Sequence, residues 1–133
     1  MNRKLFWLAT LMALLGLLSA CDDTSSAGVS ADVAAIGDPN AGRQIFETGG
    51  AAAVPCATCH TLDGTELVGP SLQGIADRAA SRTTLSAEDY IRQSITDPSA
   101  YIVEDYAAVM YKEYADKLST DDVDNVIAFL LSR

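Results

Sequence analysis

The segment Cys56-Ala57-Thr58-Cys59-His60 constrains this chain more than any other feature of its sequence. Two thiols three positions apart, followed at once by an imidazole, form the C-x-x-C-H pattern through which c-type haem is attached. The thiols can reach the two vinyl edges of one porphyrin, and the adjacent imidazole then faces the iron. We therefore predict one covalent haem c on Cys56 and Cys59, with His60 as an axial ligand of the iron and one-electron transfer as the chemistry.

Three other interpretations of this motif compete with haem attachment. A thioredoxin-like redox pair needs a βαβ setting, which the surrounding sequence lacks. A zinc site needs four ligands, whereas Cys21 is the only further cysteine and His60 the only histidine. A disulfide between Cys56 and Cys59 would close a loop too small to add much stability. Haem is favoured, and a haem-free lipoprotein with a disulfide or redox dithiol remains the alternative.

The second axial ligand follows by elimination. Haem iron of this kind is held by His and Met or by two His, and the chain has no second histidine. Of the three methionines, Met1 and Met12 lie in the N-terminal apolar segment, so Met110 is the candidate. The alternative is that Met110 only fills space in the core.

Two further segments extend the pattern: Gly-Pro-Ser-Leu-Gln-Gly-Ile-Ala-Asp-Arg at 69–78, and Val-Met at 109–110. Together with the C-x-x-C-H motif they make residues 37–133 resemble the class I cytochromes c. The resemblance implies an all-α fold, with helices wrapped around one covalently bound haem. It also implies that the Pro70 carbonyl accepts a hydrogen bond from the axial histidine and that Arg78 bonds a haem propionate.

The resemblance extends to the packing of the first and last helices of the domain. Gly42 and Phe46 match the family's glycine and aromatic residue on the first helix, and Val126 and Phe129 match their partners on the last. One position departs from the pattern, because the axial methionine is usually followed by proline and here Tyr111 follows. We expect this difference to make the ligand loop less rigid.

At the level of the fold, the chain also resembles cytochrome domains of haem-copper oxidases and the single-haem subunit of alternative complex III. This implies a non-enzymatic carrier that transfers one electron at a time between respiratory or photosynthetic partners. It would act as a subunit of a membrane complex or a shuttle to one, without a small-molecule substrate. The alternative is a haem enzyme or gas sensor with a labile sixth ligand, suggested only by Tyr111. No spare histidine could serve as its distal acid–base group.

Residues 1–20 are typical of an export signal, with Arg3 and Lys4 followed by an uncharged apolar run over 5–18. The run is short for a membrane span, which needs about 20 apolar residues. The Leu-Ser-Ala-Cys sequence that ends at Cys21 resembles the lipobox of bacterial lipoproteins, which implies lipidation of Cys21. We expect a lipid anchor on the outer, periplasmic face of the cytoplasmic membrane. An uncleaved signal-anchor is the alternative.

The chain is acidic, with a formal net charge of −9. If Arg3 and Lys4 are removed with the signal, the net charge changes from −9 to about −11. No basic stripe is present, so nucleic acid is not expected as a partner. Beyond the signal the only lysines are Lys112 and Lys117. We therefore expect redox partners with a basic or largely apolar docking face.

The chain divides into a signal (1–20), the lipidated cysteine with a flexible tether (21–37) and one domain (38–133). Capping residues predict helices over 39–49, capped by Asp38, over 86–97, capped by Ser86, and from Ser119 towards the C-terminus. A short helix is expected near 72–78, and an irregular ligand loop with one turn at most over 101–115. Alternating strand patterns are absent.

Overall fold

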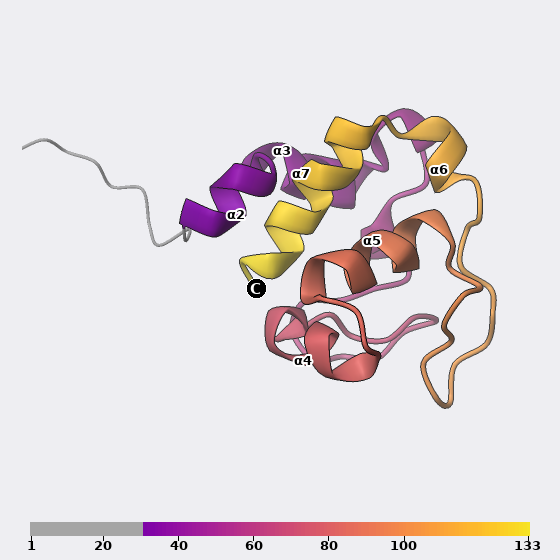
Figure 1. The fold of residues 1–133 in the computed structure, drawn as a ribbon. Coiled ribbons are helices and arrows are strands. Elements are labelled where there is room, and N and C mark those ends of the chain that lie inside the picture. Colours follow the sequence, from indigo (N-terminus) through magenta and orange to yellow (C-terminus); the bar gives the residue numbers. More distant parts are fainter. Residues whose placement is uncertain (1–30) are drawn as a thin grey trace, which may run out of the picture.

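The computed structural model describes residues 31–133 (Figure 1). The predicted signal, Cys21 and the first part of the predicted tether lie outside these residues. The helices are α2 (Ala31–Ile36), α3 (Pro39–Thr48), α4 (Ile75–Arg82), α5 (Ala87–Thr96), α6 (Tyr114–Lys117) and α7 (Thr120–Leu131), with 3-10 turns η1 (Gly50–Ala52) and η2 (Cys56–Thr58). No strand occurs over 31–133, and the all-α prediction is confirmed.

Helices α3 and α7 form the centre of the fold and lie side by side across its upper part (Figure 1). The Asp38 side chain accepts the Asn40 N–H at 2.8 Å, and Pro39 occupies the first helical position of α3. Helix α7 begins with a capping box between Ser119 and Asp122. Both starts were predicted from these residues, because the caps satisfy backbone N–H groups that would otherwise lack partners.

The two helices approach each other most closely at Gly42. A Cβ atom added there would lie 1.9 Å from the Asn125 carbonyl oxygen and 2.9 Å from the Phe129 Cβ. Next to this contact the rings of Phe46 and Phe129 pack with centroids 5.5 Å apart. The predicted contact of Gly42 and Phe46 with α7 is confirmed, and Val126 is buried in the same core.

Part of the segment predicted to be a flexible tether is helical, since residues 31–36 form α2 and pack on α7. Ile36 packs against the core, and the Asp38 N–H donates to Asn125 Oδ1 at 2.7 Å. Composition over 22–37 gave no strong apolar period, so sequence reasoning missed this helix. Its stability comes from docking on α7 rather than from its own sequence.

The lower part of the molecule contains α4 and α5 (Figure 1). Helix α5 agrees with the prediction, and Arg92 joins it to α7 through an ion pair with Asp124 at 2.5 Å. Helix α4 starts three residues later than predicted, after Gly74 with φ +61°, and continues to Arg82 because Ala79 is buried. The ligand loop ends in one short helix, α6, so the expectation of a single turn is close. None of the described helices has the length and apolar character needed to cross a membrane.

We predict that Gly42→Ala lowers the free energy of unfolding by about 3 kcal/mol or more, because the new methyl group must push α3 away from the α7 backbone. Chemical denaturation of the holoprotein measures this. Gln44→Ala, an exposed change on the same helix, is the control and should alter stability by less than about 0.5 kcal/mol. Equal stabilities for the two variants would contradict the close helix contact.

Candidate functional site

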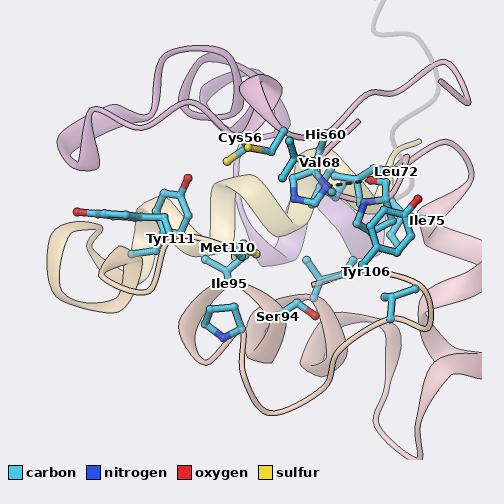
Figure 2. Close-up of a pocket in the computed structure, with 18 of the residues that line it drawn as sticks. Cys56, His60, Val68, Leu72, Ile75, Ser94, Ile95, Tyr106, Met110 and Tyr111 are labelled. Atoms are coloured by element: carbon cyan, nitrogen blue, oxygen red, sulfur yellow. Dashed lines mark hydrogen bonds between the residues drawn. The ribbon is translucent and has the colours of Figure 1, made fainter. Parts of the chain in front are cut away.

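One cavity brings together the residues singled out from the sequence. It is lined by Cys56, Cys59, His60, Pro70, Arg78 and Met110, with mainly apolar side chains between them. Figure 2 shows Cys56 and His60 on one wall and Met110, Ile95 and Ser94 on the facing wall. The first wall comes from the turn at η2 and the loop after it, and the second from α5 and the loop before α6.

His60 is fixed in orientation by a hydrogen bond between its Nδ1 and the Pro70 carbonyl oxygen, at 2.8 Å (Figure 2). A carbonyl oxygen can only accept, so Nδ1 must carry the proton. Nε2 then keeps its lone pair and can bind a metal. The structure thus shows the Pro70 contact that the family resemblance implied.

The loop that carries Pro70 is held firmly against the C-x-x-C-H segment. The Gly69 N–H donates to the Cys59 carbonyl at 2.9 Å, and the Leu72 N–H donates to the Thr61 carbonyl at 2.8 Å. Ser71 Oγ accepts from Thr61 Oγ1 at 3.1 Å and from the Gly64 N–H at 3.1 Å. These bonds on both sides of Pro70 leave its carbonyl little freedom to turn away from the imidazole.

Gly69 is the residue at this site that sequence reasoning did not explain. A Cβ atom there would lie 2.4 Å from His60 Cε1 and 2.8 Å from Nδ1, so the imidazole packs flat on the glycine backbone. The Gly-Pro pair in the sequence was the available signal. The pair serves two purposes, because the glycine makes room for the ring and the proline carbonyl orients it.

Cys56 and Cys59 lie at the two ends of the tight turn that contains η2, and both are free, half-buried thiols. Burial raises the pKa of the Cys56 thiol. The Tyr114 hydroxyl lies beside this thiol and donates to the Val54 carbonyl at 2.8 Å, and burial raises the pKa of Tyr114. The structure holds no disulfide between the two cysteines, so the disulfide interpretation gains no support.

Met110 is half-buried and packs against the hydrophobic core at the cavity wall opposite His60. Its neighbour Tyr111 packs edge-on against Tyr114, with ring centroids 5.0 Å apart, and its hydroxyl donates to Glu113 at 3.0 Å. Tyr111, which stands where the family usually has proline, thus has packing partners of its own. Met110 lines the same cavity as His60, from the opposite wall.

Arg78 lies at the edge of the cavity. Its Nη2 donates to the Ser71 carbonyl at 2.9 Å and its Nη1 to the Gln73 carbonyl, whereas its buried Nε has no hydrogen-bond partner. A buried donor without a partner costs about 1–3 kcal/mol. This orphaned N–H at the cavity edge suits an anionic group such as a propionate.

The sequence did not show how strongly α5 contributes to the cavity. Tyr90, Ile91, Ser94 and Ile95 all line it, and they share one face of that helix. The capping residue predicted the helix itself but not which of its faces lines the cavity. The tyrosines of the ligand loop at 101, 106 and 111 line the cavity too, with Tyr114 of α6.

The donor set of this cavity fits a c-type haem. Two thiols, an imidazole whose Nδ1 is bonded to Pro70 and a thioether line one mainly apolar space, and a buried guanidinium N–H without a partner lies at its edge. Thioether and imidazole are the axial ligands of cytochromes c. A zinc ion would lack ligands, because the described residues contain no group of three histidines, cysteines or carboxylates that could hold a metal.

Comparison with known proteins agrees with this chemistry. Residues 39–133 match the family model described as Cytochrome c. No curated protein matches the chain closely enough to count as a relative. The family match starts at the first residue of α3 and includes every element of the cavity. The cofactor that goes with this family is haem c, bound covalently through C-x-x-C-H.

We predict that Gly69→Ala disturbs the imidazole of His60, because the added methyl group overlaps the ring. The variant should show a lower yield of haem-loaded protein or an altered absorption spectrum. Leu67→Ala, two residues away and exposed, is the control and should keep the native spectrum. A native spectrum and yield for Gly69→Ala would contradict the close packing of glycine on the ring.

Proposed function

Since this chain belongs to the cytochrome c family, we propose that it is a membrane-tethered carrier of single electrons between respiratory or photosynthetic redox partners. The observation that carries the proposal is the cavity with His60 on one wall and Met110 on the other. Two protein ligands leave no open position for a substrate. The carrier would act as a subunit of a membrane complex or as a shuttle to one, and not as an enzyme.

Haem bound here supplies a metal that accepts and releases one electron without breaking bonds. In this proposal Cys56 and Cys59 would hold the porphyrin through their thiols, and His60 and Met110 would bind its iron. The Pro70 carbonyl keeps the imidazole in one orientation and one tautomer and raises its basicity. Arg78 holds a propionate through its free Nε–H.

The walls of the cavity would set the potential. Ile75, Ile91 and Ile95 are buried and line it, so water is kept from most of the space. A thioether ligand and an apolar surrounding both favour the reduced form of such a site. Because backbone hydrogen bonds hold the first wall, His60 would move little on electron transfer, which would limit the reorganisation that the transfer requires.

We predict that Met110→Leu lowers the midpoint potential and makes the ferric protein high-spin, because leucine offers no lone pair. Absorption spectroscopy of the ferric protein and a redox titration measure the two effects. Ala115→Leu, an exposed change at the end of the same loop that does not line the cavity, is the control and should leave both unchanged.

The same spectra decide between the carrier and a haem enzyme or gas sensor. A far-red sulfur-to-iron band in the native ferric protein, lost in Met110→Leu, supports the carrier. Rapid carbon monoxide binding by the native ferrous protein, at the same rate as by the Met110→Leu variant, would contradict the assignment of Met110 as a ligand. It would favour a labile sixth position.

The tether is proposed from the sequence alone. Lipidation of Cys21 would hold the domain at the outer face of the bacterial cytoplasmic membrane, with residues 22–30 and α2 between anchor and haem domain. More than one acyl chain gives stable anchoring, whereas a single chain binds only reversibly.

We predict that Cys21→Ser prevents lipidation and blocks cleavage at that position, because lipid transfer needs the thiol. Intact-mass analysis of membrane and soluble fractions measures this, with Ser26→Ala as the control. A native chain that keeps residues 1–20 and carries no lipid would instead show an uncleaved signal-anchor.

A further inference from the structure

Four large apolar side chains are exposed among the described residues: Leu67 (46%), Val68 (62%), Ile102 (38%) and Val109 (62%). Val68, Ile102 and Val109 also line the cavity. A side chain that both lines a cavity and remains this exposed must lie at its mouth. The three that line the cavity therefore mark the open edge of the haem site, and Leu67 precedes Val68 in the chain. All four residues are here called the apolar rim. Grouped exposed apolar side chains are typical of interaction surfaces.

Carboxylates adjoin the apolar rim. Glu66 precedes Leu67, and Glu104 and Asp105 follow Ile102 in the facing loop, and all three are exposed. They line a groove that shares Val68, Arg78 and Tyr106 with the haem cavity, so groove and mouth are continuous. Two arginines, Arg78 and Arg82, line the groove as well, and both are half-buried, whereas the three carboxylates are exposed.

The two halves of this edge are held in place. The Tyr106 N–H donates to the Val103 carbonyl at 3.1 Å, which closes a turn with Asp105 in the left-handed region at φ +69°. Aspartate tolerates that conformation better than most residues, and unusual backbone of this kind gathers at functional sites. Tyr106 and Glu66 both line the groove, and burial and the nearby Glu66 side chain raise the pKa of Tyr106.

We propose that the apolar rim, with Glu66, Glu104 and Asp105 beside it, is the docking surface for a redox protein that presents an apolar centre bordered by lysine or arginine. This inference rests on the proposed function and identifies the chemistry of its partner. Charge complementarity supports this partner. The chain has a net charge of −9, and exposed carboxylates at the mouth of the cavity attract a basic partner and repel an acidic one. The apolar side chains then supply the contact from which water is excluded.

The test uses the full-length holoprotein and the triple variant Glu66→Gln, Glu104→Gln, Asp105→Asn. The matched control replaces three exposed carboxylates that line neither cavity nor groove: Glu47→Gln, Asp116→Asn and Asp121→Asn. Both variants lose the same charge, so a difference between them reports position rather than net charge. Redox titration first checks that spectrum and potential stay native in each.

Stopped-flow reduction by hexaammineruthenium(II), a cation, and by hexacyanoferrate(II), an anion, then measures the field at the haem edge. At low ionic strength we expect the rim variant to lose about tenfold in the ratio of cation to anion rate, and the control much less. The difference should fade as salt is added. Equal ratios for the two variants would overturn the docking surface while leaving the carrier function intact.

A protein probe tests the apolar part. Electron exchange with a basic, lysine-rich soluble cytochrome c should be about tenfold slower for the rim variant at low salt. Val68→Ser with Val109→Ser should slow it several-fold at high salt, where charge steering is screened. Unchanged rates for both variants would overturn the proposal. If the native protein accepted electrons from none of the three reagents, the carrier function would be overturned as well.

Discussion

The hydrogen bond from His60 Nδ1 to the Pro70 carbonyl is the contact on which the site depends. It selects the tautomer with a free Nε2 and aims this nitrogen at the cavity. Gly69 allows the ring to lie against the backbone, and the bonds of Gly69 and Leu72 to the C-x-x-C-H segment fix the carbonyl. The imidazole thus has one orientation, set by the backbone of the loop that carries Gly69 and Pro70.

A second close contact, between α3 and α7, supports the first wall, because α3 also packs on η2. Gly42 brings α3 against α7, and the Phe46–Phe129 pair fills the space beside it. Phe46, Val126 and Leu130 of these helices also line the cavity. The helix pair is therefore both the core of a small domain and part of the haem pocket. A chain of this size gains much of its stability from such shared burial.

The sequence predicted most of the site because its chemistry uses rare residues. One histidine, one C-x-x-C and one methionine outside the apolar N-terminal segment left few choices, and capping residues located three helices. It missed what depends on tertiary packing. Helix α2 exists because it docks on α7, and α4 begins where Gly74 turns the chain. Gly69 matters because it lies against the ring of His60, nine residues earlier in the chain. None of these has a period or a motif of its own.

The two walls of the cavity are held in different ways. The His60 wall is braced by backbone hydrogen bonds, whereas Met110 lies in a loop that is held by side-chain packing of Tyr111 and Tyr114. The loop also carries Ile102, Glu104, Asp105 and Val109 of the proposed docking surface. One segment would therefore both supply the sixth ligand and face the partner.

The central claim is that Met110 sulfur and His60 Nε2 bind one iron from opposite walls. Proton NMR of the ferrous holoprotein with methyl-labelled methionine tests it most directly. The Met110 methyl signal should lie far upfield, because the methyl group would lie over the porphyrin face. This signal should be absent in the Met110→Leu variant. A Met110 methyl signal at an ordinary chemical shift in the fully reduced, folded protein would contradict it.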